Sequence, residues 1–304
     1  MANKILITGS SGMIGTRLFE KLLADGHRVV GFDRNPNKWQ PGLNKDTIIG
    51  DLLKKEDIQK IPSDFDLIVH LAANARVYDL VVAPELALEN IVSTYNILDF
   101  ARRNNIERFI FSSSRETYGN REKIIAKEDD VDINLCESAY SASKISDEVL
   151  VYSFSKCYGI NYIVCRFSNV YGMYDNSERF VPLMIRRMKK GEGVEIFGQD
   201  KVLDFTYIDD CVGGIAQCIE KFDKAKNNVF NIASGKGDKL IDVAEIIKEE
   251  LGSESAISLG QNRTGEVVKY IADISKAEKM LSYKPRYSLE NGLKLSIDWY
   301  KRGC

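Results

Sequence analysis

Residues 4–16 read KILITGSSGMIGT, a short apolar run followed at once by a glycine-rich turn. Lys4–Thr8 predicts a buried strand, because the run is short and almost uniformly apolar. Met13–Leu23 is amphipathic and is followed by Asp25-Gly26, which predicts a helix and its end. A strand, a glycine turn and a helix in this order are typical of the first unit of a parallel α/β sheet.

The glycine turn also predicts a binding site for a dinucleotide. Glycines allow tight backbone angles, so main-chain N–H groups can approach a pyrophosphate at the positive end of the helix. The spacing alone is weak, because the chain holds 22 glycines and a plain turn is the alternative. Its position directly after the first strand makes the prediction specific. The predicted cofactor-binding residues of this turn are Gly9, Gly12, Met13, Ile14 and Gly15.

The second predicted strand, Arg28–Phe32, is followed by Asp33. A carboxylate at this place can accept both ribose hydroxyls of NAD and repels the 2′-phosphate of NADP. Arg34 is the complication, because an arginine here can pair with a 2′-phosphate. The sequence therefore favours NAD, with NADP as the alternative.

Short apolar runs alternate with helix-length amphipathic stretches through the first half of the chain. This alternation implies right-handed crossovers and a parallel sheet covered on both faces. The predicted class is α/β, with a Rossmann-type doubly wound sheet. The further predicted strands are Thr47–Ile49, Asp66–Leu71, Arg108–Ser113 and Tyr162–Arg166, and the further helices are Glu85–Arg103 and Tyr140–Cys157.

The pattern loosens after Arg166 and predicts a smaller α/β lobe that binds the substrate. Residues 1–168 are predicted to bind NAD and residues 169–304 to form mainly the cap, with segments within about 204–232 returning to the first lobe. Two polar stretches, Tyr171–Arg179 and Gly252–Glu266, are expected to be loops. The predicted elements between and after them are helices at Phe180–Lys190, Cys211–Glu220 and Ile241–Leu251, strands at Glu195–Phe197, Asp204–Tyr207 and Val229–Ile232, and two final helices.

Charge composition excludes several classes of function. The chain has 304 residues, with 42 Lys and Arg against 44 Asp and Glu, a formal net charge of -2. This balance argues against a nucleic-acid binder or a polybasic membrane binder. Only His27 and His70 are present, so a histidine-based zinc site is not expected and no metal is predicted.

Cysteine spacing and the N-terminus indicate a compartment. None of the six cysteines forms a C-x-x-C pair, and most lie in apolar patterns. Free thiols in a reducing compartment are therefore favoured over disulfides. The run before Gly9 is too short for a signal peptide or a membrane span. A cytoplasmic protein is expected.

Tyr140 and Lys144 stand one turn apart on a predicted helix and suggest the chemistry. Tyrosine, with its free pKa near ~10, is a poor base at neutral pH. A neighbouring ammonium and the positive ring of NAD⁺ would stabilise the phenolate, which could then take a proton from a substrate hydroxyl. Ser114, at the end of the strand Arg108–Ser113, is placed to hydrogen-bond the same oxygen.

The same helix contains a second Tyr-x-x-x-Lys, Tyr152 to Lys156. The two tyrosines point about a third of a turn apart, so only one can face the nicotinamide. Tyr140 has the serine strand upstream at a sensible spacing, whereas Tyr152 lies near the helix end. Tyr152 is therefore interpreted as a packing or surface residue.

These motifs together resemble the extended short-chain dehydrogenase/reductase family, in its NAD-dependent sugar-nucleotide epimerase/dehydratase branch. The resemblance spans nearly the whole chain. It is carried by Thr8–Gly15, Asp51-Leu52, His70-Leu71-Ala72-Ala73, Asn90, Ser112-Ser113-Ser114, Tyr118-Gly119, Tyr140-x-x-x-Lys144, Arg166-x-x-Asn169-x-Tyr171-Gly172, Ile196-Phe197-Gly198, Asp204-Phe205-x-Tyr207-Ile208-Asp209-Asp210 and Arg263-x-Gly265-Glu266.

The resemblance implies roles for individual residues. It makes Ser114, Tyr140 and Lys144 catalytic, and it adds Asp51, Leu52, Leu71, Ala72, Ala73, Asn90 and Ser112 to the NAD-binding residues. For the sugar nucleotide it implies Asn169, with Arg263 on the diphosphate and Glu266 on the ribose. A guanidinium suits phosphate oxygens and a carboxylate suits a diol. A solvated loop is the alternative for Arg263 and Glu266. The resemblance also implies a homodimer formed by the helices Glu85–Arg103 and Tyr140–Cys157 as a four-helix bundle.

Two departures from the family pattern bear on the substrate. Family members commonly carry an arginine before the Asp-Phe pair, where this chain has Leu203; Lys201, on the same strand face, is a partial substitute. Glu116 occupies a position where dehydratases and decarboxylases often carry a carboxylate. It is a possible catalytic residue, and local pairing with Arg115 or Arg121 is the alternative. Arg115 is also a candidate receptor for the carboxylate of a uronate.

The leading hypothesis is a sugar-nucleotide 4-epimerase of the UDP-hexose or UDP-uronate type, acting through a transient 4-keto sugar. A 4,6-dehydratase or decarboxylase using Glu116 is the nearest alternative, since it shares the first oxidation. A keto-sugar reductase that consumes NADPH is disfavoured by Asp33. A catalytically silent nucleotide sensor or scaffold is disfavoured by the intact Ser114, Tyr140 and Lys144.

Overall fold

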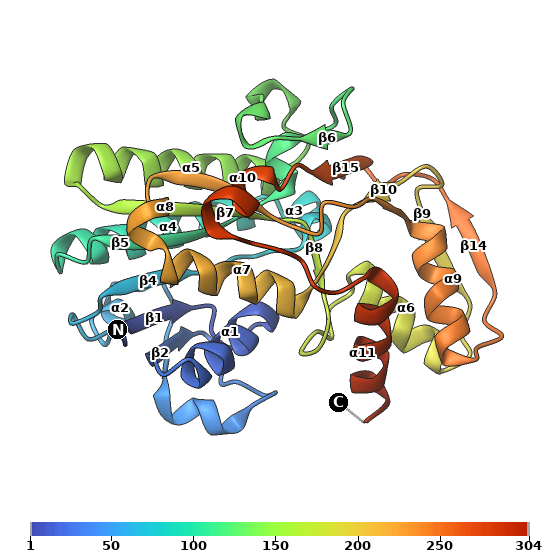
Figure 1. Ribbon diagram of the computed structural model, residues 1–304, viewed down its shortest axis with the longest axis horizontal. Coiled ribbons are helices and arrows are strands. Elements are labelled where there is room, and N and C mark those ends of the chain that lie inside the picture. Colours follow the sequence, from blue (N-terminus) through green and yellow to red (C-terminus); the bar gives the residue numbers. More distant parts are fainter. Residues whose placement is uncertain (1, 303–304) are drawn as a thin grey trace.

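A seven-stranded parallel sheet forms the centre of the computed structural model, which describes residues 2–302 (Figure 1). Its strand order is β12-β7-β5-β4-β1-β2-β3, and every neighbouring pair is parallel. The predicted doubly wound α/β class is confirmed. The strands are β1 (Lys4–Thr8), β2 (Arg28–Asp33), β3 (Thr47–Ile49), β4 (Leu67–His70), β5 (Arg108–Ser114), β7 (Asn161–Phe167) and β12 (Asn228–Ile232).

Helices cover both faces of this sheet, as the short crossovers require. α4 (Leu86–Arg103) and α5 (Ala139–Tyr158) pack together on one face, and α1 (Met13–Ala24) and α7 (Ile208–Glu220) pack together on the other (Figure 1). The chain runs outward from β1 to β3 in one direction and from β4 to β12 in the other. The order therefore reverses between β1 and β4, and ligands of such sheets bind at the carboxyl ends of the strands at this point.

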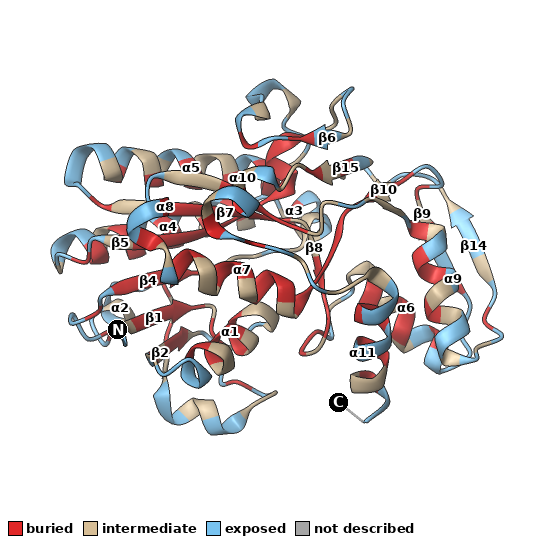
Figure 2. Ribbon diagram, viewed as in Figure 1, coloured by how far each residue is buried: buried red, intermediate tan, exposed pale blue. Residues whose placement is uncertain are grey.

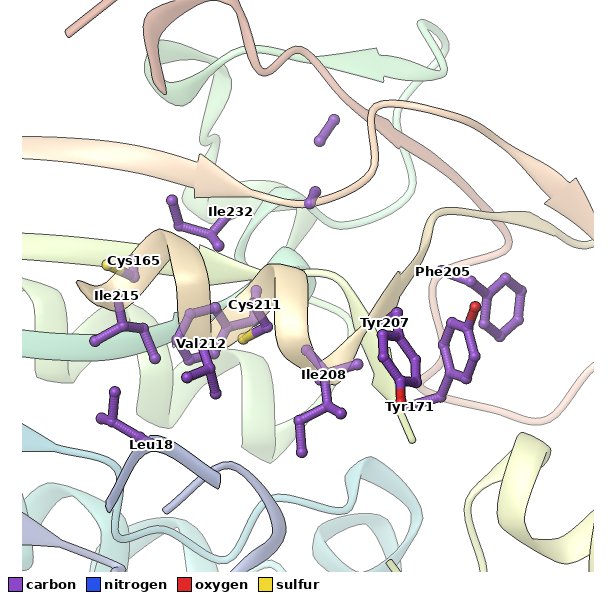
Figure 3. Close-up of a cluster of buried hydrophobic side chains, with 14 of the residues drawn as sticks. Leu18, Cys165, Tyr171, Phe205, Tyr207, Ile208, Cys211, Val212, Ile215 and Ile232 are labelled. Atoms are coloured by element: carbon purple, nitrogen blue, oxygen red, sulfur yellow. The ribbon is translucent and has the colours of Figure 1, made fainter. Parts of the chain in front are cut away.

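The core lies on both sides of the central strands, which are buried along most of their length (Figure 2). On one side α7 inserts Ile208, Val212 and Ile215 between the sheet and Leu18 of α1 (Figure 3). The rings of Tyr171, Phe205 and Tyr207 continue this cluster toward the smaller lobe. One apolar core therefore extends from the sheet into the second half of the chain.

The smaller lobe is built on helices α6 (Phe180–Lys189), α9 (Leu240–Leu251) and α11 (Leu289–Lys301), which pack together (Figure 1). Its short parallel pairs are β8 (Asn169–Tyr171) with β11 (Phe205–Tyr207), and β9 (Val194–Phe197) with β14 (Ile257–Gly260). A four-stranded sheet joins this lobe to the first half of the chain, which contributes its edge strand β6 (Ile125–Ala126). The other strands, in order toward β6, are β13 (Asp238–Lys239), β10 (Val202–Leu203) and β15 (Lys269–Ala272).

Short helices complete the chain. The α-helices are α2 (Lys55–Ile58), α3 (Val77–Val82), α8 (Phe222–Ala225) and α10 (Ser275–Leu281), and the 3₁₀ turns are η1 (Pro41–Asp46), η2 (Arg115–Tyr118), η3 (Glu128–Asp130) and η4 (Ile133–Leu135).

Two expected loops contain strands. Gly252–Glu266 was expected to be irregular, but Ile257–Gly260 forms β14, whose residues are exposed or half-buried and therefore carry little apolar signal. Tyr171 begins the other expected loop and instead ends β8. Both strands are stabilised by pairing with distant partners, β9 and β11, which a local pattern does not show.

Three findings bear on the compartment and metal predictions. Within residues 2–302 no helix is long and apolar enough to cross a membrane, and no three His, Cys, Asp or Glu residues cluster in a way that suits a metal. The five described cysteines are free thiols, while Cys304 lies outside the described residues.

Candidate active site

The glycine turn joins β1 to α1 at the switch point of the sheet. Gly12 caps α1 in an extended conformation, and the first turn of α1 has neither a side-chain cap nor an acidic residue. Its N–H groups are therefore available to an anion, since the first N–H groups of a helix lack partners within the helix. Gly9, Gly12, Met13, Ile14 and Gly15 all line the same cavity.

Two of these glycines are required by sterics. Gly9 has φ +72°, and a Cβ atom there would lie 2.7 Å from the backbone nitrogen of Ala72. A Cβ atom on Gly15 would lie 2.0 Å from the carbonyl oxygen of Gly9. Side chains at either position would push the turn away from β4 or from the start of α1, so the turn needs glycine to keep this shape.

Asp33 lies at the end of β2, with its carboxylate held by the backbone. The N–H of Ser11 donates to Oδ2 at 3.0 Å and the N–H of Asn35 donates to Oδ1 at 3.0 Å. Burial raises the pKa of Asp33, and these backbone donors oppose that rise. The carboxylate lines the cavity, where it can accept hydroxyl groups of a ribose.

Arg34 is engaged by two carboxylates. Its Nε donates to Asp51 Oδ1 at 3.1 Å and its Nη2 donates to Glu89 Oε2 at 3.3 Å. Because these two carboxylates already balance the positive charge of Arg34, the guanidinium has less attraction for the 2′-phosphate of NADP. The pairing therefore favours NAD over NADP. Leu52 lines the cavity, whereas Asp51 turns to Arg34 and to the backbone N–H of Leu53.

Residues after β4 form the opposite wall. Leu71, Ala72 and Ala73 line the cavity beside the glycine turn. Asn90 of α4 is buried behind them and donates to the carbonyl oxygen of Asn74 at 3.2 Å and to Ser143 Oγ at 3.1 Å. Asn90 therefore ties the loop after β4 to α5.

The cavity runs from the glycine turn into the smaller lobe and has a volume of about 920 Å³. Its near end is bounded by Asp33 and the glycine turn, and its far end by Phe197, Arg263 and Glu266. Tyr140 and Lys144 line the part between them. The arrangement suits a dinucleotide and a second ligand that meet at Tyr140.

Ser114, Tyr140 and Lys144 come together at the carboxyl end of β5. Ser138 caps α5 by accepting the N–H of Ser141 at 3.2 Å, which fixes the first turn that carries Tyr140. The Nζ of Lys144 donates to the carbonyl oxygen of Ser112 at 3.0 Å. Ser114 hydrogen-bonds to the Tyr140 side chain. All three side chains are buried.

Burial keeps Tyr140 protonated in the free chain. Desolvation raises the pKa of Tyr140 to about 12, opposed by the hydrogen bond from Ser114 and by the charge of Arg179. Desolvation also lowers the pKa of Lys144. Further positive charge at the site is therefore needed before Tyr140 can act as a base at neutral pH.

Glu116 pairs with Arg115, one of the alternatives left open by the sequence. Arg115 Nη2 lies 2.8 Å from Glu116 Oε1, and both side chains are buried at the edge of the cavity. Arg121 pairs with Asp130 instead, at 2.9 Å. Burial raises the pKa of Glu116, and Arg115 opposes this rise.

The residues predicted for the nucleotide lie at the far end of the cavity. Lys201, the candidate substitute for the arginine that is replaced by Leu203 in this chain, forms an ion pair with Glu266. Asn169 donates from its Nδ2 to the carbonyl oxygen of Asp204 at 3.0 Å. The Arg263 guanidinium lies 4.0 Å from the ring centre of Phe197, a contact typical of a cation over an aromatic face. Asn169, Lys201, Arg263 and Glu266 all line the cavity.

Arg179 and Asp147 are among the charged residues near the site that were not singled out from the sequence. Arg179 lines the cavity beside Tyr140, and Asp147 lies 4.0 Å from Lys144. Asp147 follows Lys144 by three residues, so helical spacing was a usable signal for it. Arg179 comes from a distant segment and carries no such signal.

Helix α5 places the second tyrosine away from the site. Tyr152 donates to Glu148 Oε2 at 2.8 Å and stacks against Tyr162, with ring centres 5.2 Å apart. Lys156 is exposed. Neither residue is among the described residues that line the cavity.

A glycine turn at a sheet switch point, next to a buried Ser–Tyr–Lys group, suits an enzyme that binds a dinucleotide. Residues 5–233 match the model of the NAD dependent epimerase/dehydratase family, and the chain belongs to this family. NAD is the cofactor of the family.

Relatives share almost the full length of the chain. An uncharacterized protein of Methanocaldococcus jannaschii is 35% identical over 97% of this chain and 95% of its own. The UDP-glucose 4-epimerase of Thermotoga maritima, solved with UDP-glucose, is 32% identical with a TM-score of 0.90, covering 98% of this chain and 99% of that one. The UDP-glucuronic acid 4-epimerase of Bacillus cereus, solved with UDP-glucuronic acid and NAD, is 29% identical with a TM-score of 0.90 and the same coverage.

Proposed function

We propose that the protein is an NAD-dependent UDP-sugar 4-epimerase. The main support for this proposal is the buried Ser114–Tyr140–Lys144 group, which lines one cavity between the glycine turn and the smaller lobe. The similarity to two 4-epimerases of UDP-sugars supports the same choice.

The cofactor fits the residues present. The uncapped first turn of α1 suits a pyrophosphate, and Asp33 suits a ribose diol. Leu52, Leu71, Ala72 and Ala73 supply apolar walls. When bound, NAD⁺ supplies a hydride acceptor and a positive charge beside the sugar.

In this proposal Tyr140 takes the proton from the C4 hydroxyl and later returns it to the C4 oxygen of the 4-keto sugar. The inversion would arise because the hydride lost from C4 returns to the opposite face of that carbon. Lys144 stabilises the phenolate, and Ser114 hydrogen-bonds the same oxygen. The 4-keto sugar must rotate in the cavity between the two proton transfers, so that its other face is presented. The far part of the cavity, bounded by Phe197 and Arg263, is the region that would hold its nucleotide.

The substrate class rests on the smaller lobe. Arg263 is proposed to bind the diphosphate, Asn169 the sugar nucleotide, and the Lys201–Glu266 pair to divide, with lysine on phosphate and carboxylate on ribose. Arg115 is already paired with Glu116, which weighs against Arg115 as the receptor of a uronate and favours a neutral hexose.

A 4,6-dehydratase or decarboxylase remains the second candidate, because of Glu116. Its Oε2 is buried without a hydrogen-bond partner among the described residues, and burial raises its pKa. A carboxyl group with a raised pKa beside the cavity is suited to deliver a proton to a leaving hydroxyl.

One experiment decides between these reactions. The purified protein with NAD⁺ is incubated with UDP-glucose, UDP-N-acetylglucosamine and UDP-glucuronic acid, and the products are followed by NMR and mass spectrometry. Inversion at C4 with unchanged mass is expected. Loss of water indicates a dehydratase and loss of carbon dioxide a decarboxylase, and either would replace the proposal. Arg115→Ala should lower the rates of conversion of UDP-glucuronic acid and of UDP-glucose by similar factors.

The proposal extends to organisation and compartment. Residues 1–168 would hold NAD and 169–304 mainly the sugar nucleotide, with β12 returning to the sheet.

A homodimer through α4 and α5 is supported by exposed apolar side chains on both helices, Leu88, Val92, Tyr95, Val149 and Tyr158. Val92→Lys should then give a monomer in light scattering. The free thiols within residues 2–302 support the cytoplasm.

A further inference from the structure

Asp147 is a buried carboxylate directly below the catalytic lysine. It lies on α5 one turn after Lys144 and has no exposed surface. The Thr94 hydroxyl is the polar group that acts on its oxygens, and no backbone N–H, arginine or other hydroxyl within residues 2–302 donates to them. Its ion-pair partner is Lys144, whose Nζ lies 4.0 Å from Oδ2. Burying a carboxylate with so few hydrogen-bond donors is costly, so its presence here calls for a functional reason.

The next residue, Glu148, shows what a structural carboxylate looks like in the same place. Its oxygens accept from Arg166 at 2.8 Å and 2.7 Å, from Ser113 at 2.5 Å and from Tyr152 at 2.8 Å. Arg166 therefore neutralises the charge of Glu148. Asp147 has no such arginine and is left as the uncompensated negative charge beside Lys144.

Of the other groups around Lys144, Glu148 also favours the ammonium, although the Glu148 carboxylate is shared with Arg166. His70 on β4 is neutral, because burial and the charge of Lys144 lower its pKa to about 3. Phe111 on β5 places its ring centre 4.8 Å from Nζ, and Ser112 offers a carbonyl oxygen. The charged groups that act on Tyr140 from other elements are Arg179, which favours its phenolate, and Glu116, which opposes it.

A polar chain fixes the surroundings of Asp147. Thr8 Oγ1 lies 2.6 Å from Nδ1 of His70, and Nε2 of His70 lies 3.2 Å from Thr94 Oγ1. The Thr94 hydroxyl in turn favours the ionised form of Asp147. Desolvation outweighs this effect and raises the pKa of Asp147 to about 6, so the group is charged above that pH.

We propose that Asp147 is a positioning residue that holds Lys144 as an ammonium ion beneath Tyr140. Tyr140, Lys144 and Asp147 then form one electrostatic unit along a single face of α5. Burial disfavours the ammonium, and the carboxylate restores it. This role rests on the proposed function for its catalytic consequence, although the charge state of Lys144 can be measured without any substrate.

The test follows Lys144 directly. Protein labelled with ¹³C at lysine Cε is titrated by NMR, and the Lys144 signal is assigned as the one missing from Lys144→Met. Asp147→Asn keeps the size of the side chain and removes its charge. The midpoint of Lys144 is expected to fall by about one to three pH units. Asp223→Asn, which removes an exposed carboxylate, is the matched control and should leave the midpoint in place.

A kinetic readout separates positioning from folding. For Asp147→Asn, kcat at neutral pH should fall about tenfold or more while KM stays within about twofold. If this variant does not fold, Thr94→Val keeps the carboxylate and removes the adjacent hydroxyl, and a smaller fall of the midpoint is expected. An unchanged Lys144 midpoint, or an equal shift in Asp223→Asn, overturns the proposal. Absence of epimerase activity in the wild-type chain overturns the proposed function and leaves the titration result standing.

Discussion

Helix α5 carries Tyr-x-x-x-Lys twice, and the two copies meet opposite surroundings. Tyr140 and Lys144 are both buried and line the cavity. Tyr152 is half-buried and Lys156 is exposed. Tyr152 donates a hydrogen bond to the Glu148 carboxylate. Burial and, next, the negative charge of Glu148 raise the pKa of Tyr152. A negative neighbour thus disfavours the phenolate of the second tyrosine, whereas Lys144 is placed to favour that of the first.

The difference shows that position along the helix decides the chemistry. The first turn of α5 lies at the carboxyl end of β5, where the sheet opens to the cavity. Tyr152, three turns later, packs against Tyr162 near the start of β7. The motif supplies a tyrosine and a lysine on one face, and the sheet determines whether that face meets a ligand.

The largest expected effect comes from Tyr140→Phe. This change removes the proton acceptor and keeps the ring, so the cavity retains its shape. Turnover of UDP-glucose is expected to fall about 10²–10⁴-fold, the range for loss of a general base. NMR of the product measures it, and retained NAD binding, followed by calorimetry, shows that the site is intact.

Lys144→Met should produce the next largest effect. Without the ammonium, the apparent pKa of Tyr140 rises, so the acid limb of the kcat profile moves to higher pH. At neutral pH kcat is expected to fall about tenfold to a hundredfold, which corresponds to about one to two pH units. Lys156→Met is the matched control on the same helix and should leave the profile in place. An unshifted limb in Lys144→Met would contradict the assigned role.

Tyr152→Phe should lower stability and leave catalysis unchanged. The variant loses a hydrogen bond to the charged Glu148, so the free energy of unfolding is expected to fall by about 1–2 kcal/mol. Urea denaturation measures this change. A loss of turnover comparable to that of Tyr140→Phe would show that the wrong tyrosine had been assigned.

The smallest effect is expected from Arg34→Ala. Because Arg34 is paired with Asp51 and Glu89, its loss should change NAD affinity by less than about 1 kcal/mol. Calorimetric titration with NAD⁺ and NADP⁺ checks this. A large gain in NAD affinity, or strong NADP⁺ binding by the wild-type chain, would show that Arg34 is free to face the phosphate.

Most strands of the central sheet could be predicted from the sequence, because they are apolar runs that alternate with helices of clear hydrophobic period. The strand predicted at Lys4–Thr8 has the observed bounds, and so does Thr47–Ile49. β14 was missed, since Ile257–Gly260 is exposed or half-buried and depends on pairing with β9. α3 (Val77–Val82) was also missed, because a stretch of its length gives too few turns to show a period.

Residue types at the candidate site were readable, whereas their partners were not. The order of strand, glycine turn and helix pointed to Gly9 and Gly15, and the structure gives the contacts that require them. The ion pair of Lys201 with Glu266 joins segments far apart in the chain, and no local spacing predicts it. The burial that isolates Asp147 is likewise a property of the packed helices.

Rates of C4 inversion for Tyr140→Phe and Tyr152→Phe, measured side by side on UDP-glucose with saturating NAD⁺, test the assignment of the base. The Tyr152→Phe rate is expected to match the wild type and to exceed that of Tyr140→Phe by about 10²–10⁴. A ratio near one, or an inverted ratio, would contradict the assignment of Tyr140 as the residue that moves the proton.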